Sequence, residues 1–321
     1  MSPIKTEILK FLKNYNDFLS GEDISRELKT SRAAIWKYIK ELQKDGYKIS
    51  ATSNRGYKLD NTPDKLYPHE IKDGLSTRIL GLNLIYHEKI ESTMPEAFRL
   101  AMEGSAEGTV VLAENQTKGR GRLGRGWVSP KGKGIYASIV LRPKFSLAEV
   151  AKLTLLTAVA LSEAIEKTTG LTPQIKWPND LLIGNKKVAG ILTEMNADMD
   201  RVRFIIVGIG INVNTPSNSL PEVATSLKIE TGQTIPRVKL FQMILVSLEY
   251  WYLTAQAKGF DPIIEEWKKR SVTLGKRIRV VEANQILEGE AIDLDAFGGL
   301  VIKNDDGKFI TRMSGDVTHV R

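Results

Sequence analysis

The chain has 321 residues, of which 42% are hydrophobic and 26% are charged, with a net charge of +8; these values are typical of a globular protein with two or three domains. It has no cysteine and three scattered histidines, which excludes disulfides, thiolate catalysis and a zinc finger. Because it has no apolar run of membrane-spanning length and no cleavable signal, we expect a cytoplasmic protein without a membrane partner, whose only metal is Mg²⁺ arriving with a nucleotide.

Residues 1–65 have the pattern of a small DNA-binding unit. Apolar residues near the N-terminus recur at helical spacing, and Ser20-Gly-Glu-Asp23 is a capping box for a second helix. A basic third helix is predicted over 31–43, and residues 47–59 are typical of a hairpin with a basic tip. Two helices, a tight turn, a basic helix and a hairpin predict a winged helix-turn-helix.

The third helix of this unit is amphipathic. Ile35, Ile39 and Leu42 are spaced to face a core. The opposite face would enter the major groove, and the hairpin would touch the DNA backbone or minor groove. Residues 1–65 contain 13 basic and 9 acidic residues, so a helical protein-interaction module with a charged face is the alternative. The predicted DNA contacts are Ser31, Arg32, Ala33, Trp36, Lys37, Lys40 and Arg55.

Two prolines among turn-forming residues place a domain boundary at 61–68. A strand is predicted over 82–90, and Thr93-Met-Pro-Glu96 then predicts a capping box that begins a helix. Ser92 and Thr93 therefore have a purely structural explanation. The glycine-rich loop that follows one strand later suggests that one of these hydroxyls also meets a ligand.

Residues 116–136 combine six cations and six glycines with no acid. Glycine lets backbone amides close on an anion, and arginine offers a planar fork for carboxylate or phosphate oxygens. Alternating apolar runs at 109–113 and 135–141 predict flanking strands, so we expect a loop that binds a polyanion, with Trp127 offering a flat apolar face. A disordered nucleic-acid tail and a solvated hairpin tip are the alternatives. The cations are Lys118, Arg120, Arg122, Arg125, Lys131 and Lys133.

A second set of polar residues follows this loop. A capping box at 146–149 predicts a long helix to about residue 169, and a buried strand then ends in Lys176-Trp-Pro-Asn-Asp180. Asp180 is either a turn residue or the carboxylate that holds Mg²⁺ on a nucleotide. Lys187 follows a hairpin turn on an otherwise apolar strand, so it either extends to solvent or supplies a fixed positive charge to a pocket. Residues 203–214 lack the third glycine of a dinucleotide fingerprint, which excludes a Rossmann site.

Taken in order and spacing, these motifs resemble those of the bifunctional biotin protein ligases, which ligate biotin to acetyl-CoA carboxylase and also repress the biotin operon. The resemblance covers the entire chain. One position departs from a common family form, because Met94 stands where asparagine is frequent. The matching motifs are Glu91-Ser-Thr, Gln116 with Gly119-Arg-Gly-Arg122, Trp127, Lys176-Trp-Pro-Asn-Asp180, Lys187-Val-Ala-Gly190 and Gly208-Ile-Gly-Ile-Asn212.

The resemblance implies an α+β multidomain protein. Its parts would be a winged helix-turn-helix at 1–65, a mixed-sheet α/β ligase domain like that of class II aminoacyl-tRNA synthetases at 66–270, and a C-terminal domain at 271–321. The short strands of that last segment predict a small SH3-like β-barrel. Its role is either stability or the docking of ATP or the carrier protein.

The resemblance also implies the chemistry and the partners. Biotin and ATP would form biotinoyl-5′-AMP, and the acyl group would then pass to a lysine of the biotin carboxyl carrier protein. The adenylate would promote a homodimer that binds the operator DNA of biotin biosynthesis and transport genes.

The implied site residues fall into three groups. Lys187 and Arg122 would be catalytic, Asp180 would hold Mg²⁺, and the adenylate would contact Arg120, Arg122, Arg125, Trp127 and Asn212. Biotin would contact Ser92, Thr93, Gln116, Gly119, Arg120, Arg122, Tyr136, Lys187, Gly190 and Gly208.

Three alternatives to this interpretation are a lipoate-type ligase, a transcriptional regulator whose ligase site has decayed into a sensor, and a ligase without regulation. The Gly-Arg-Gly-Arg and Lys-Trp-Pro-Asn-Asp motifs argue against the first. The presence of Lys187, Arg120, Arg122 and Trp127 argues against the second, and the intact basic helix argues against the third.

Overall fold

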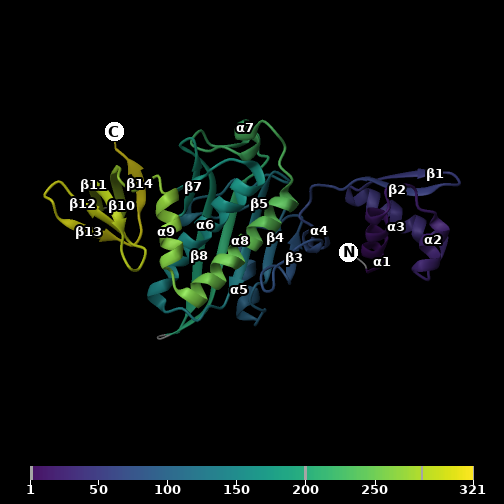
Figure 1. Ribbon diagram of the computed structural model, residues 1–321, viewed down its shortest axis with the longest axis horizontal. Helices are drawn as coiled ribbons and strands as arrows, with labels where there is room; N and C mark the ends of the chain where they lie inside the picture. Colours follow the sequence, from purple (N-terminus) through teal and green to yellow (C-terminus); the bar gives the residue numbers. More distant parts are fainter. Residues whose placement is uncertain (1–2, 199–200, 283–284, 321) are drawn as a thin grey trace. The chain divides into compact units, whose positions relative to one another are not determined.

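The computed structural model describes residues 3–198, 201–282 and 285–320. The chain forms two compact units, Met1–Lys65 and Leu66–Arg321, which are described separately. Figure 1 shows the elements of both units.

The first unit has the predicted three helices and hairpin. Ile35, Ile39 and Leu42 are buried in its core, as expected from their spacing. The predicted reciprocal capping box at Ser20 is wrong in detail, because the hydroxyl of Ser20 accepts from the backbone N–H of Glu22 rather than from that of the third helical residue. The elements are α1 (Pro3–Asn14), α2 (Gly21–Glu27), α3 (Arg32–Asp45), β1 (Lys48–Thr52) and β2 (Gly56–Asn61).

The second unit is built on a seven-stranded mixed sheet with the order β3-β4-β5-β9-β8-β7-β6. The pair β3–β4 is parallel and the other pairs are antiparallel. The central strands have apolar side chains on both faces of the sheet, as expected of a sheet that is covered on both sides. The strands are β3 (Leu84–His87), β4 (Val110–Ala113), β5 (Gly134–Leu141), β6 (Gln174–Lys176), β7 (Asp180–Ile183), β8 (Lys186–Ala197) and β9 (Val202–Asn212).

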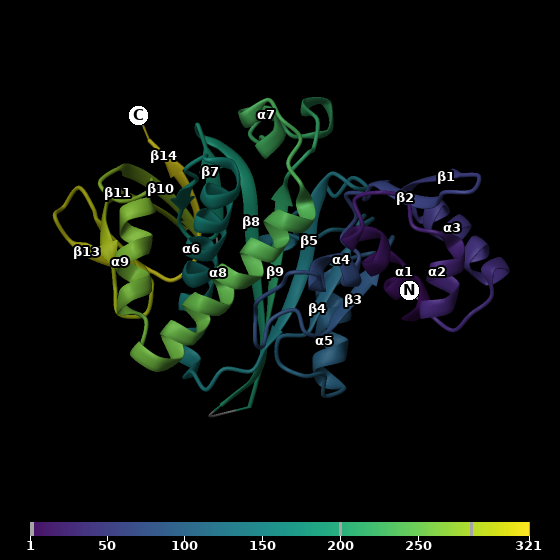
Figure 2. The same cartoon turned by 45° about the vertical axis from the view of Figure 1, so that its right-hand side comes forward.

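Helices cover the two faces of this sheet unequally. The helices α6, α8 and α9 bury the larger core against one face, and Figure 2 shows α8 running diagonally across the sheet. The helix α5 packs on the other face over a smaller cluster that includes Met94, Val140 and Phe204. The helices of this unit are α4 (Pro68–Lys72), α5 (Thr93–Met102), α6 (Val150–Thr169), α7 (Leu227–Thr231), α8 (Arg237–Lys258) and α9 (Asp261–Arg270).

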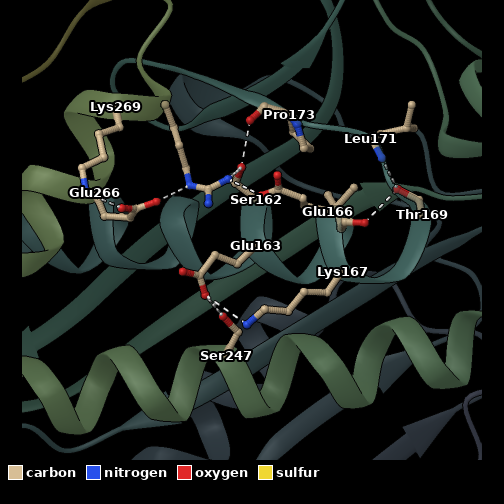
Figure 3. A network of polar contacts seen from close by, with 12 residues as sticks. Ser162, Glu163, Glu166, Lys167, Thr169, Leu171, Pro173, Ser247, Glu266 and Lys269 are labelled. Atoms are coloured by element: carbon tan, nitrogen blue, oxygen red, sulfur yellow. Dashed lines mark hydrogen bonds and ion pairs between the residues drawn. The ribbon is translucent and has the colours of Figure 1, made fainter.

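A network of polar contacts joins α6, α8 and α9, the three helices on the face with the larger core (Figure 3). Arg270 on α9 bonds to Glu266 on its own helix and to Glu166 and Ser162 on α6, while Ser247 on α8 donates to Glu163 on α6. The network links the three helices that cover this face, and the cavity described below lies on the opposite face, beside α5.

The last part of the chain forms a five-stranded antiparallel sheet with the order β13-β12-β11-β10-β14. Its apolar face, which includes Ile278 and Ile302, joins the same core as α6 and α8. The packing is therefore continuous from residue 66 into this sheet. The strands are β10 (Arg277–Glu282), β11 (Gln285–Leu294), β12 (Leu300–Lys303), β13 (Phe309–Arg312) and β14 (Asp316–His319).

Two predicted caps have different outcomes. The capping box of Ser146 and Glu149 is confirmed before α6. The capping box predicted at Thr93 is wrong, because Ser92 is the N-cap of α5 and makes no side-chain cap bond. The hydroxyl of Thr93 does not cap the helix but lies beside that of Ser138, in the site described below.

Over the described residues, no helix is long and apolar enough to cross a membrane.

Candidate active site

A cavity of about 330 Å³ lies on the α5 face of the central sheet and extends to Asp316, the first residue of β14. Its floor is made of small residues that the register of β5, β9 and β8 brings side by side. Ser138 pairs with Gly208, and Gly210 pairs with Gly190. Because these residues have small side chains or none, a ligand or a side chain of the loop can lie in direct contact with the strand backbone.

One end of the cavity is polar and uncharged. The side-chain amide oxygen of Gln116 accepts from the backbone N–H of Thr93 at 2.9 Å, and the hydroxyls of Thr93 and Ser138 lie 2.7 Å apart. The hydroxyl of Ser92 is buried and has no hydrogen-bond partner within the described part of the chain. An unsatisfied buried hydroxyl among such neighbours suits a neutral ligand group that has donors and acceptors at fixed positions.

Lys187 lines the cavity from β8, next to a β-bulge. In the pair β7–β8, Leu182 lies opposite Lys187 but Leu181 lies opposite Ala189, so one extra residue is inserted in β8. Such a bulge redirects the neighbouring side chain. The ammonium of Lys187 lies 2.6 Å from Asp180 Oδ1 and 5.4 Å from the ring centroid of Trp127.

The other end of the cavity is cationic. Arg122 donates to the side-chain oxygen of Asn179 at 3.0 Å, and Arg125 forms an ion pair with Asp316 on β14. Burial lowers the pKa of the Arg122 guanidinium from its usual value. Burial likewise lowers the pKa of Lys176 on the adjacent strand β6, against the opposing effect of Asp180. An anion at this end would favour the charged form of Arg122, which burial disfavours.

Trp127 lies flat on the floor between the two ends. A Cβ atom at Gly210 would come within 2.6 Å of its indole ring, and one at Gly190 within 3.1 Å. Its ring N–H is buried and has no partner among the described residues. The glycines at these two positions are thus explained by the close approach of the aromatic ring.

Backbone hydrogen bonds hold the loop that carries Trp127 at its start and its end, because the N–H of Lys118 donates to the carbonyl of Glu91 and the N–H of Gly132 donates to the carbonyl of Glu114. Exposed ion pairs lie beside these bonds. Lys118 lies 2.9 Å from Glu91, and Lys131 lies 2.6 Å from Glu88. The loop is therefore held between β4 and β5, as predicted, and the description as a disordered tail is excluded.

A buried ion pair lies where the loop ends and β5 begins. Arg237, the first residue of α8, donates to Glu114 at 2.8 Å and to the carbonyl of Gly134 at 3.1 Å, and both charged side chains are 1% exposed. Glu114 also accepts from the backbone N–H of Leu66, the first residue of the second unit.

Most of the predicted site residues of the second unit come together in this cavity, and two do not. Gly119 has its own reason to be glycine, since a Cβ atom there would come within 2.9 Å of the Ser129 hydroxyl. Tyr136 is fully buried and donates to the carbonyl of Pro130, so its ring packs outside the cavity. The predicted residues that line the cavity are Ser92, Thr93, Gln116, Arg120, Arg122, Arg125, Trp127, Asp180, Lys187, Gly190, Gly208 and Asn212.

Several lining residues were not singled out from the sequence. Ser138 lies on a strand that reads as apolar, and Asp316 lies nearly 200 residues from the loop that it contacts. Val223 and its neighbours come from a segment without sequence periodicity, which bonds to the backbone of Lys187. No local signal identifies these residues, because their position depends on contacts distant in sequence.

The predicted DNA-contacting residues lie on the exposed face of α3 and at the tip of the β1–β2 hairpin in the first unit. Ser31 caps α3 through its hydroxyl, which accepts from the backbone N–H of Ala34. Arg55 pairs with Asp17 at 2.9 Å and lies over the ring of Phe18, so its guanidinium is partly engaged within the unit. The residues Arg32, Ala33, Trp36, Lys37 and Lys40 are exposed.

In the described part of the chain, no group of three or more His, Asp or Glu side chains could hold a metal ion. Asp180 supplies one carboxylate at the cavity, beside Lys187. This arrangement differs from an all-protein metal cage, and Mg²⁺ commonly combines one or two carboxylates with substrate phosphates.

Comparison with known proteins identifies each part of the chain. Residues 86–212 match the biotin/lipoate A/B protein ligase family, residues 5–58 match a helix-turn-helix domain, and residues 273–320 match the biotin protein ligase C-terminal domain. The solved biotin protein ligase of Aquifex aeolicus in complex with biotin and ATP is 32% identical, with a TM-score of 0.65, and the match covers 75% of this chain and 99% of that one.

Full-length relatives extend the match to both units. The bifunctional ligase/repressor BirA of Bacillus subtilis is 42% identical over 95% of this chain and 96% of its own length, and BirA of Escherichia coli is 27% identical over 98% and 97%. The fold and the cavity define a biotin protein ligase. With the helix-turn-helix unit and the full-length match, the chain belongs to the family of bifunctional biotin ligase/repressors.

Proposed function

We propose that this protein uses ATP to activate biotin as biotinoyl-5′-AMP, transfers the biotinoyl group to a lysine of the biotin carboxyl carrier protein, and represses biotin genes as an adenylate-bound dimer. The observation that carries the proposal is the cavity itself. Neutral polar side chains (Ser92, Thr93), the ammonium of Lys187 and the guanidinium groups of Arg122 and Arg125 line the same cavity. This set of groups suits a ureido ring, a carboxylate and a phosphate chain in one ligand.

In the first step, a carboxylate oxygen of biotin would attack the α-phosphorus of ATP and pyrophosphate would leave. Both reactants are anions, so the site must neutralise charge that grows on the α-phosphate. Lys187 would take this role, since its ammonium lines the cavity beside Asp180 and the ring of Trp127. Arg120, Arg122 and Arg125 would hold phosphate oxygens from the loop.

Trp127 would form a wall for the adenine ring, and Asn212 would bond near the ribose or phosphate. The indole lies directly on the floor at Gly190 and Gly210, so ligand entry would require the loop to rise and close again over the adenylate. Closure would exclude water, which otherwise hydrolyses a mixed anhydride.

In the second step, the neutral amine of the carrier lysine would attack the acyl carbonyl, the acyl–phosphate bond would break, and AMP would leave. Mg²⁺ would arrive on the nucleotide phosphates, with Asp180 as the candidate protein ligand. When bound, the ion would supply charge neutralisation to the phosphates.

We also propose that the second unit contains two domains, residues 66–270 with a sheet like that of class II synthetases and residues 271–321 with an SH3-like barrel. The shared hydrophobic core would hold them together, and Asp316 would connect the second to the loop. The exposed face of α3 would read operator DNA, with the homodimer presenting two such helices to paired half-sites.

The direct test of the ligase is to incubate the protein with biotin, MgATP and a biotin-carrier domain and to measure the mass of the carrier. Addition of one biotinoyl group to the carrier lysine is expected. Lipoic acid in the same assay tests the lipoate-type alternative. An unmodified carrier, together with adenylate-dependent DNA binding, would instead indicate a sensor that keeps the fold of the enzyme.

Removal of residues 1–65 should abolish operator binding and leave ligation measurable. The second unit contains the whole cavity and its own core, and the first unit contains the exposed face of α3. A gel-shift assay and carrier labelling on the same preparation would check both outcomes. Complete loss of labelling by a folded fragment would show that the first unit is needed for catalysis.

A further inference from the structure

Met94 lies where the hydrophobic core under α5 meets the cavity. It is 4% exposed, packs with Ala97 and Ile206 in the cluster between α5 and the sheet, and also lines the cavity. In the sequence, Met94 directly follows Ser92 and Thr93, which line the polar end of the same cavity. A single flexible apolar side chain therefore forms part of the wall beside the hydrogen-bonding groups.

The side chain of Met94 also occupies the space in front of Gly208. A Cβ atom at this glycine would lie 2.5 Å from Met94 Sδ and 3.2 Å from its Cγ, while the next neighbour, the carbonyl of Leu192, would be 3.3 Å away. Gly208 lies inside the extended strand β9. A glycine within a strand commonly marks a close approach, and here the approaching atom is the methionine sulfur.

We propose that Met94 determines which acids this ligase accepts, by setting the size of the cavity at the end that receives the ring system of the acid. This inference deepens the proposed function and rests on it. Methionine is unbranched and adapts to irregular gaps, so the wall that it forms can be moved by changes on either side. Because the residue borders the cavity, shortening it enlarges the cavity instead of leaving a closed void.

The first test is substrate selectivity. Pyrophosphate release would be measured with biotin and with two larger acids, biotin sulfone and biotin methylated on a ureido nitrogen. In Met94→Ala, the ratio of kcat/KM for at least one larger acid over that for biotin is expected to rise about tenfold or more, because a methylene-sized change in a pocket has effects of this order. Ratios unchanged for both acids would overturn the proposal.

Two variants serve as controls for this test. Met94→Leu keeps a similar volume and should retain the wild-type ratio. Met102→Ala changes a methionine on the same helix that is 53% exposed and lies away from the cavity, so it should also retain the ratio. If Met94→Ala does not give a cooperative thermal transition, Met94→Val takes its place in both tests.

The second test is a double-mutant cycle with Gly208→Ala. The added methyl group should push the thioether into the cavity and raise the KM for biotin about tenfold, whereas in the Met94→Ala background it should have much less effect. An equal cost in both backgrounds would show that the two positions do not act together, which contradicts the proposal.

Failure of this proposal and failure of the proposed function give different results. If the unmodified protein releases no pyrophosphate with biotin and ATP, the proposed activity itself is wrong. If the unmodified protein is active but the selectivity ratios and the cycle show no coupling, the activity stands and Met94 is a packing residue only.

Discussion

Lys187→Ala should lower the rate of adenylate formation about 100- to 1,000-fold, the range observed when a preorganised charge-stabilising group is removed from a site. The ammonium of Lys187 lies 2.6 Å from Asp180 Oδ1 and lines the cavity, and in the proposed mechanism it neutralises charge where the carboxylate and the α-phosphate meet. Pyrophosphate release with saturating biotin and MgATP would measure this step without the carrier.

The adjacent residue provides a matched control for this prediction. Lys186 lies on the same strand and is exposed, whereas Lys187 lines the cavity, so Lys186→Ala removes the same charge from the chain and should leave the rate nearly unchanged. A rate near that of the unmodified protein in Lys187→Ala would assign charge stabilisation to the loop arginines instead.

Arg237→Ala should lower the free energy of unfolding of the second unit by about 3–5 kcal/mol, because it leaves the buried carboxylate of Glu114 without its cationic partner. Both side chains are 1% exposed and lie 2.8 Å apart. Urea unfolding followed by tryptophan fluorescence suits this measurement, since every tryptophan except Trp36 lies in the second unit.

The same variant should also affect the loop, because Arg237 holds the carbonyl of Gly134 where the loop returns to β5. Faster proteolysis within residues 116–133 is therefore expected at urea concentrations well below the unfolding transition. Arg99→Ala is the control, since Arg99 pairs with Glu96 and Glu103 on an exposed helix face, where ion pairs contribute little. If the two variants unfold at the same urea concentration, the buried pair is not a stabilising element.

Local sequence patterns were sufficient for the organisation of the chain. Helical spacing in residues 31–43 placed α3 and its buried face, and alternating runs on both sides of the cationic loop placed β4 and β5. These signals are local, because a helix or strand records its buried face in the spacing of its own apolar residues. The capping box expected at Thr93 was wrong because the hydroxyl of this residue has a partner, Ser138, 45 residues away.

The chemistry of the candidate site was also suggested by residue type. Glycines and arginines between two strands indicated an anion site, and an isolated lysine on an apolar strand indicated a fixed charge. Most of the residues named on these grounds line one cavity. Tyr136 and Gly119 were exceptions. Residue type does not tell where the ring of Tyr136 packs, and Gly119 is required by close approach to the carbonyl oxygen of Trp127 within its own loop.

The sequence by itself therefore determined the elements with strong periodicity, such as α3, β4, β5 and α6, that a cationic loop interrupts a sheet, and that Lys187 is unusual for its strand. Only the tertiary structure decided how these parts meet. The bulge at Lys187 arises from pairing with β7, Asp316 reaches Arg125 across nearly 200 residues, and Met94 fills the space left by Gly208. Register and packing are set by partners distant in the chain, so they leave no periodic trace in the local sequence.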